Sequence, residues 1–166
     1  MFKKYITMNL STQMKKGAEE VKLTVYLAGQ IHDKWREELM KQTKDKGLSI
    51  DFVYPQTEHN LSDDIGEKIL GKQPGDYYRD EAASAINNFR TTVLMEKADM
   101  VVALFGDQYR QWNTAMDATT AINKGKPLII IRPKNLIHAL KELSNKANVT
   151  VETIEQAVEV LEYINQ

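Results

Sequence analysis

The chain has 166 residues, of which 42% are hydrophobic and 27% charged, an ordinary composition for one soluble globular domain. Its formal net charge of −1 offers no basic surface to a nucleic acid polymer. Cys is absent, which excludes disulfides, a thiolate zinc site and a cysteine nucleophile.

The first 20 residues contain lysines but no continuous apolar run, so they make a poor secretory signal. We interpret residues 1–20 as a disordered extension before a domain at residues 21–166, with a weak organellar transit peptide as the alternative. The longest apolar run, residues 127–131, is far shorter than the roughly 18 residues of a membrane-spanning helix. We therefore expect a cytoplasmic protein without membrane contact.

Short β-branched runs alternate with longer helical patterns along the domain. In chain order the pattern predicts a strand at residues 21–28, a helix at 31–46, a strand at 48–54, a helix at 79–97, a strand at 99–105, a helix at 113–124, a strand at 127–131, a helix at 136–146, a strand at 149–151 and a helix at 153–164. Residues 56–78 hold several Gly and Pro residues and are the least regular stretch, with room for a short helix at residues 65–70.

This alternation predicts an α/β, flavodoxin-like three-layer sandwich, in which a five-stranded parallel sheet of order 2-1-3-4-5 carries helices on both faces. Such sheets bind ligands beyond the carboxyl ends of their strands, here at the switch point between the first and third strands. We expect residues 26–32, residues 106–117 and the residues after Ile131 to converge there. The long stretch at residues 56–78 leaves from the same edge.

The predicted helix at residues 79–97 carries candidate ligand-binding side chains. Apolar residues including Phe89 and Val93 fall on one side of it. Asn87 and Arg90 are three residues apart, so they share a helix face and can reach one ligand. The alternative for Arg90 is a solvated side chain without a ligand.

A candidate nucleophile follows the third predicted strand. Asn113 suits the N-cap of the next helix, which places Asp117 in the first turn or just beyond it. The helix dipole there favours an ionised carboxylate by ~0.3–1 kcal/mol. An ionised carboxylate facing a ligand cleft can attack the anomeric carbon of a sugar. The alternative is that Asp117 only stabilises the start of its helix.

The first βα turn and the histidines carry weaker signals. Gly29 ends the first strand before a helix, which fits a phosphate cradle or simply a tight turn. Of the three histidines, only His32 falls at the expected cleft, and no pair has metal-ligand spacing, so we expect no metal. The polar residues 58–64 form either a lid, a base-reading loop or a solvated turn.

Several segments together resemble a known family. Residues 26–38 (YLAGQIHDKWREE), 98–103 (ADMVVA), 113–118 (NTAMDA) and 125–128 (GKPL) look like the signature series of nucleoside 2-deoxyribosyltransferases. The opening motif is most similar to that of the branch called YtoQ. The resemblance runs from about residue 21 to residue 164.

The resemblance implies a double displacement, in which a carboxylate attacks the anomeric carbon, the base leaves, and a second base or water resolves the deoxyribosyl ester. The family nucleophile, a Glu, matches Asp117, and the tyrosine that hydrogen-bonds it matches Tyr26. Two further family carboxylates fall on Gln111 and Thr91. The general acid is therefore unassigned, and a missing general acid costs ~10²–10⁴ in rate. The candidates for this role are Glu58, Asp63, Asp64, Asp80 and Asp107.

These observations predict an enzyme that cleaves or exchanges the N-glycosidic bond of a (deoxy)nucleoside or nucleotide without a cofactor. Asp117 and Tyr26 are the predicted catalytic residues. The predicted substrate-binding residues are Gly29, His32, Asn87, Arg90, Gln111 and Asn113. His32 and Arg90 also suit a phosphate or carboxylate group. The alternatives are a non-catalytic nucleotide-binding or sensor module and phosphoribohydrolysis at a similar helix start.

We expect a small-molecule nucleoside or nucleotide as the ligand, and a homodimer or a higher homo-oligomer as the assembly. Relatives of this fold complete the pocket with residues from a neighbouring subunit. Within the chain, Tyr77, Tyr78, Tyr109 and Trp112 lie on segments where a partner can cover them. The alternative for these aromatic residues is packing beneath the long loop.

Overall fold

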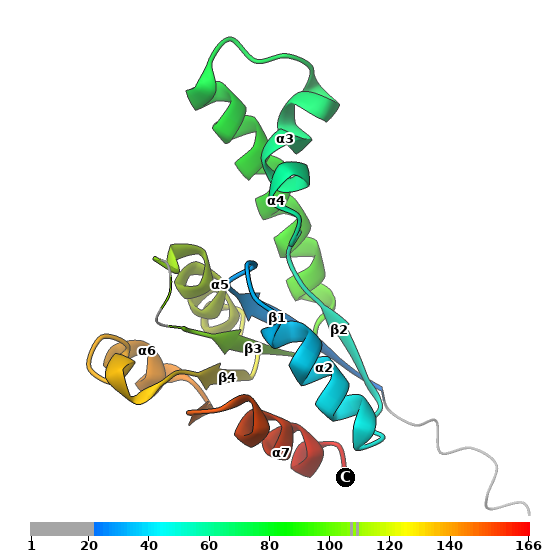
Figure 1. The fold of residues 1–166 in the computed structure, drawn as a ribbon, viewed down its shortest axis with the longest axis vertical. Helices are drawn as coiled ribbons and strands as arrows, with labels where there is room; N and C mark the ends of the chain where they lie inside the picture. Colours follow the sequence, from blue (N-terminus) through cyan, green and yellow to red (C-terminus); the bar gives the residue numbers. More distant parts are fainter. Residues whose placement is uncertain (1–21, 107, 109) are drawn as a thin grey trace, which may run out of the picture.

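The computed structural model describes residues 22–106, 108 and 110–166, so the expected extension at residues 1–20 lies outside it. Five parallel strands form one sheet of order β2-β1-β3-β4-β5 with helices on both faces (Figure 1). The predicted sheet order is thereby confirmed. The elements are β1 (Leu23–Gly29), α2 (Trp35–Asp45), β2 (Ile50–Val53), α3 (His59–Leu70), α4 (Asp76–Lys97), β3 (Met100–Leu104), α5 (Trp112–Asn123), β4 (Leu128–Ile131), the 3₁₀ turn η1 (Lys134–Leu136), α6 (Lys141–Lys146), β5 (Val149–Val151) and α7 (Ile154–Ile164).

Alternate residues of the strands feed two separate cores. On one face Leu27 packs with residues of α2 and α7, including Leu39 and Leu161. On the other face Tyr26 packs with the last turn of α4 and with α5, including Met95. The central strand β3 is buried along its whole length, as expected for a parallel strand covered on both sides. Tyr26 therefore points toward α4 and α5, the side on which the candidate site lies.

The turn after β1 is shaped by close packing against the start of α2. A Cβ atom at Gly29 would lie 2.7 Å from Cζ2 of Trp35, so no larger side chain fits there without movement. The helix predicted at residues 31–46 begins only at Trp35. Residues 30–34 instead run as irregular backbone across the carboxyl end of the sheet. The end of β1 is thus held close to α2 at the rim of the sheet.

The stretch predicted to be least regular is mostly helical. α3 spans twelve residues, about twice the predicted short helix, and α4 begins at Asp76 rather than at residue 79. Gly66, which argued against a long helix, lies where α3 crosses α4, and a Cβ atom there would be 2.6 Å from the backbone nitrogen of Ala83. The glycine is therefore a packing residue inside α3 and not a helix breaker.

α3 and the first part of α4 (residues 59–90, the helical arm) project from the sheet as an antiparallel pair (Figure 1). Large apolar side chains lie on the surface of the arm: Tyr77 and Phe89 are each 72% exposed. Within the part of the chain that the structure describes, the apolar side of α4 that includes Phe89 and Val93 is thus left exposed. No helix of the described ranges is long and apolar enough to cross a membrane.

The helix predicted at residues 136–146 is divided into the short turn η1 and the six-residue α6. Leu136, Leu140 and Leu143 nevertheless pack against the core beneath α5. This part of the chain lies on the side of the sheet distant from the helical arm (Figure 1).

Candidate active site

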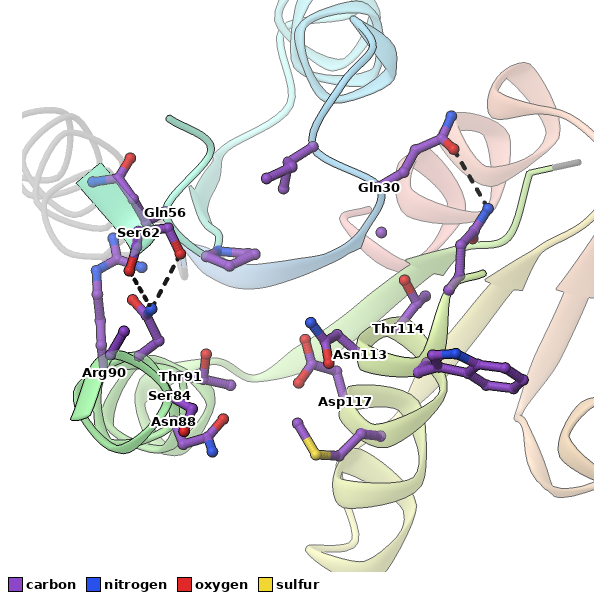
Figure 2. Close-up of a pocket in the computed structure, with 18 of the residues that line it drawn as sticks. Gln30, Gln56, Ser62, Ser84, Asn88, Arg90, Thr91, Asn113, Thr114 and Asp117 are labelled. Atoms are coloured by element: carbon purple, nitrogen blue, oxygen red, sulfur yellow. Dashed lines mark hydrogen bonds between the residues drawn. The ribbon is translucent and has the colours of Figure 1, made fainter. Parts of the chain in front are cut away.

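A cavity of about 780 Å³ opens beyond the carboxyl ends of β1 and β3, between the turn after β1, the helical arm and the start of α5. This is the switch point that the fold class predicts. Figure 2 shows Asp117 on α5 facing Thr91 on α4 across the gap. Seven residues predicted for the site line the cavity: Gly29, His32, Asn87, Arg90, Gln111, Asn113 and Asp117.

Asp117 and Tyr26 form the buried centre of the site. Tyr26, fully buried in β1, donates a hydrogen bond from its hydroxyl to Oδ2 of Asp117 at 3.3 Å. The same hydroxyl lies 3.5 Å from Oγ1 of Thr91 on α4. Asp117 is 8% exposed and borders the cavity. Because Tyr26 holds Oδ2, the second carboxylate oxygen is left to meet a ligand.

The electrostatics of the pair follow from burial. Loss of hydration raises the pKa of Asp117 to about 6, while the Tyr26 hydrogen bond and the positive charge of Arg36 act in the opposite direction. Burial also raises the pKa of Tyr26, and the nearby Asp117 charge adds to that effect. At neutral pH the centre therefore holds an ionised carboxylate and a neutral phenol that donates to it.

Arg36 of α2 is a buried cation close to this centre, and the sequence analysis did not single it out. It is 5% exposed and donates hydrogen bonds to the carbonyl oxygens of Leu27 (3.3 Å), Gly29 (2.8 Å) and Gln30 (2.6 Å). Burial lowers its pKa to about 10, which leaves it charged at neutral pH. The Nε1 group of Trp35 also donates to the Gln30 carbonyl, at 3.0 Å. Together they fix the turn that forms the rim of the cavity.

Three predicted ligand-binding residues also hold the walls together. Asn87 of α4 donates from Nδ2 to Ser62 of α3, at 2.9 Å to the carbonyl oxygen and 3.1 Å to Oγ (Figure 2). Arg90 donates to the carbonyl oxygen of Tyr54 at 2.7 Å. Gln111 accepts from the Gly106 amide at 3.2 Å and donates to its carbonyl oxygen at 3.1 Å. These bonds tie the arm to the segment after β2 and pin the loop that follows β3.

The predicted N-cap of the nucleophile helix is wrong. α5 begins at Trp112 with Gln111 as its N-cap residue, so Asn113 lies within the first turn. The side chain of Asn113 is consequently not used for capping and borders the cavity instead. Asp117 lies two residues further into the helix than the prediction assumed, on the buried side of the helix.

Two of the candidate general acids line the cavity, namely Asp63 and Asp80. Glu58 and Asp64 are not among its lining residues, and Asp107 lies outside the described residues. Nδ1 of His59 lies 2.8 Å from a carboxylate oxygen of Asp63, and the centre of the His59 ring lies 5.8 Å from that of His32. No group of three metal-binding side chains gathers among the described residues.

The segment after Ile131 does not join the main cavity. Pro133 instead lines a second hollow of about 470 Å³ on the other side of the β1 end, together with Gln30 and Gly106. The predicted convergence of three segments is therefore wrong in its third member, because β4 ends one strand further from the switch point.

The arrangement joins the anionic carboxylate of Asp117, the neutral hydroxyl of Tyr26 that hydrogen-bonds it, and polar amide and hydroxyl groups on the facing wall. The cavity volume falls within the ~300–1,000 Å³ typical of small-molecule sites. Such a site suits nucleophilic substitution at an electrophilic carbon of a polar ligand.

A family profile and a sequence relative both match this chain to the same family. The profile of the family "Nucleoside 2-deoxyribosyltransferase YtoQ" matches residues 26–165. An uncharacterised protein, YtoQ, from Bacillus subtilis (strain 168) is 63% identical over 140 residues, covering 84% of this chain and 95% of that protein.

Two solved structures share the fold. A conserved protein from Enterococcus faecalis V583 matches with a TM-score of 0.57 at 16% identity, covering 86% of this chain and 99% of that one. A 2-deoxyribosyltransferase from Bacillus psychrosaccharolyticus matches with a TM-score of 0.50 at 15% identity, covering 83% of this chain and 95% of that one.

Proposed function

The chain belongs to the YtoQ family of nucleoside 2-deoxyribosyltransferases, and on that basis we propose that it cleaves or exchanges the N-glycosidic bond of a deoxynucleoside or deoxynucleotide. The observation that carries this proposal is the Asp117–Tyr26 pair at the cavity. A carboxylate that is buried, ionised above about pH 6 and held on one oxygen by a neutral phenol is suited to attack at carbon.

The proposed reaction consists of two successive substitutions at C1′ of the sugar. The free oxygen of the Asp117 carboxylate bonds to C1′, the C1′–N bond breaks, and the departing base keeps the electron pair and takes up a proton. A second base, or water, then bonds to C1′ and displaces the carboxylate, giving up its own proton. Two inversions give net retention at C1′.

The proton for the leaving base comes from the wall opposite α5. Asp80 on α4 and Asp63 on α3 are the candidate carboxylic acids that line the cavity. Thr91 and Gln111, which occupy the positions of two family carboxylates, cannot donate a proton in this way. The same two neutral residues favour the second candidate function, a nucleotide-binding sensor that performs no chemistry.

Trapping of the covalent intermediate tests the proposal. We expect incubation with a 2-fluoro-arabinosyl nucleoside to add one fluorosugar to the intact mass of the protein, with the label on Asp117. The matched control is Asp51→Asn, an exposed carboxylate paired with Lys22 on the sheet edge, which leaves labelling unchanged. Asp117→Asn abolishes labelling.

Two outcomes oppose the catalytic proposal. An unlabelled Asp117 together with no base released from any deoxynucleoside or deoxynucleoside monophosphate contradicts it. Ligand binding without turnover, unaffected by Asp117→Asn, identifies the sensor instead.

We also propose that the working form is a homo-oligomer. The cavity is bordered on its outer side by the exposed side chains of Trp112 and Met116, and the exposed apolar residues of the helical arm lie on the neighbouring element. A second copy that covers the arm would bury these residues and complete the outer wall.

A further inference from the structure

The start of α5 presents backbone hydrogen-bond donors for which no acceptor is found among the described residues. Gln111, its N-cap residue, makes no side-chain capping bond, and the first turn holds no acidic residue. The side-chain amide of Gln111 is engaged by Gly106 instead. The backbone N–H groups of Trp112, Asn113 and Thr114 precede the first intrahelical bond, so no carbonyl within the helix accepts from them.

A side chain that reaches the cavity points to a ligand at the same place. Thr114 is 4% exposed and lines the cavity, and its hydroxyl bonds to none of the described residues. Figure 2 shows Thr114 with its oxygen directed toward the turn after β1 and not into the helix. Because no fully buried side-chain oxygen of the described residues lacks a partner, the Thr114 oxygen is accessible from the cavity, where a ligand atom can accept its hydrogen bond.

The nearest cation that lines this end is Arg110, directly before the helix. It forms no ion pair with any described residue, whereas the other lining arginine, Arg90, is committed to the Tyr54 carbonyl oxygen. The amides, the Thr114 hydroxyl and the Arg110 guanidinium are all able to donate. A group that only accepts, and that carries negative charge, complements this end of the cavity.

The spacing of residues along α5 gives the distance between the helix start and the proposed nucleophile, Asp117. Thr114 and Asp117 are three residues apart, so they share a helix face with a separation of about 4.5 Å along the axis. A pentose that presents C1′ to Asp117 extends its exocyclic C5′ arm over a comparable length. The substituent on C5′ would then reach the donors at the helix start.

We propose that the first turn of α5, with Thr114 and Arg110, forms an anion subsite for the 5′-phosphate of the substrate sugar. The assignment of the bound group as a sugar phosphate rests on the proposed function, while the anion subsite itself does not. It selects deoxynucleoside 5′-monophosphates over deoxynucleosides, whose neutral 5′-hydroxyl cannot satisfy three amides, a hydroxyl and a guanidinium. Apart from Asp117 itself, the carboxylates among the described residues that line the cavity are Asp63 and Asp80, which lie on the arm, on the far wall.

Titration with 2-deoxyribose 5-phosphate, 2-deoxyribose and inorganic phosphate, followed by ¹H–¹⁵N NMR, tests the subsite. None of these probes has a glycosidic bond, so the result does not depend on turnover. We expect 2-deoxyribose 5-phosphate to shift the amide signals of Trp112, Asn113 and Thr114 and to bind at least tenfold more tightly than either other probe. Inorganic phosphate shifts the same signals more weakly.

Variants separate the donors from general effects on the fold. Arg110→Gln and Thr114→Val each weaken binding of the sugar phosphate about tenfold, which corresponds to the loss of ~1.4 kcal/mol. Two matched controls, Arg79→Gln on the arm and Thr119→Val on the exposed side of α5, leave it unchanged. Asp117→Asn retains or strengthens phosphate binding because it removes a nearby negative charge.

Unshifted amides at the helix start, or undiminished binding in both Arg110→Gln and Thr114→Val, overturn the subsite. Equal affinity for inorganic phosphate and the sugar phosphate overturns the assignment of a sugar. A protein that binds the sugar phosphate here but is never labelled on Asp117 retains the subsite and loses the proposed catalysis.

Discussion

The carboxyl group of Asp117 loses hydration when the chain folds, and its pKa rises from 3.8 to about 6. An acid whose pKa is raised in the folded state destabilises the fold in its ionised form. That penalty is absent below about pH 4, grows as the pH rises towards 6 and is complete above it, at roughly 3 kcal/mol. The side chain proposed as the nucleophile therefore opposes folding at neutral pH.

Asp117→Asn should accordingly stabilise the protein while it abolishes activity. The substituted amide is uncharged and still accepts from Tyr26, so we expect the free energy of unfolding to rise by about 2–3 kcal/mol at pH 8 and to stay unchanged near pH 4. Urea unfolding at the two pH values measures this. A variant equally or less stable at pH 8 would contradict the burial cost assigned to the carboxylate.

The same pKa sets the pH dependence of the reaction. If Asp117 is the nucleophile, as proposed, only its ionised form attacks carbon, so kcat/KM should fall tenfold per pH unit below about pH 6 and level off above it. Tyr26→Phe removes the donor that lowers this pKa, so the midpoint should move to higher pH. The measurement is the pH dependence of kcat/KM for the native protein and for Tyr26→Phe. An identical midpoint in the two profiles would argue against the Tyr26–Asp117 hydrogen bond.

Arg36 links the rim of the cavity to its centre. Arg36→Met removes the side-chain donor from the carbonyl oxygens of Leu27 and Gly29, and it removes a positive charge that favours ionised Asp117. The Gln30 carbonyl oxygen keeps the hydrogen bond from the Trp35 indole. We expect a loss of about 3–5 kcal/mol in stability and a higher Asp117 pKa.

Carboxyl-detected NMR titration at a temperature where the variant remains folded measures the pKa. Arg36→Lys keeps the charge without the planar fork, so it should restore most of the Asp117 pKa but only part of the stability. If Arg36→Met lowers stability and leaves the Asp117 pKa in place, Arg36 acts on the turn alone.

Some of the candidate site residues could be predicted from the sequence, and others could not. Asp117 and Tyr26 are found through motif spacing and the family resemblance. Arg36 is not found in this way. It is spaced with Leu39 and Thr43 as one buried stripe of α2, but a charged side chain is ordinarily predicted to lie in solvent. Partners that satisfy Arg36 come from the carbonyl groups of β1, which no local pattern reveals.

Among the elements, the central strands are the most predictable, because β3 and β4 are short apolar runs buried along their whole length. The edge strands β2 and β5 are only partly buried and are found from their β-branched residues and their place in the alternation. The helical arm is not predictable in this way, since the Gly and Pro residues between residues 66 and 75 indicate breaks in a helix. Only Pro74 and its neighbours separate two helices. Gly66 instead allows α3 to approach α4, an effect that depends on a contact 17 residues away in the sequence, with Ala83.

Gly66→Ala tests this account of the arm. The added methyl would lie within 2.8 Å of Ala82 and Ala83 atoms, so α3 must move away from α4. We expect overpacking to cost about 1–3 kcal/mol, which exceeds the gain of up to ~1 kcal/mol in helix propensity. Amide hydrogen exchange in α3 should accelerate, as should exchange at Asn87, whose partner Ser62 moves with α3.

Gly75→Ala is the matched control for the arm. A Cβ atom at Gly75 meets nothing within 4 Å, and its backbone is extended, so the change costs at most the order of 0.5 kcal/mol from the N-cap of α4. Equal exchange rates in α3 for Gly66→Ala and Gly75→Ala would refute the packing role of Gly66.

For the whole molecule, the exposed arm predicts association. Phe89 is 72% exposed on an arm that the other described residues leave uncovered, whereas Tyr163 is 78% exposed on α7 at the opposite end (Figure 1). We expect light scattering after gel filtration to show a dimer or larger species for the native chain. Phe89→Glu should shift it toward the monomer, and the control Tyr163→Glu should not. A native monomer at micromolar concentration contradicts the proposed oligomer.

The cavity has two walls of unlike construction. The β1 end is fastened to α2 by the buried guanidinium of Arg36 and by the Trp35 indole, while the opposite wall stands on an arm that packs mainly on itself. The two walls therefore differ in how much of the fold holds them in place. We expect the wall at the end of β1 to discriminate the sugar stringently, and the wall on the arm, which few other elements support, to accept bases of different size.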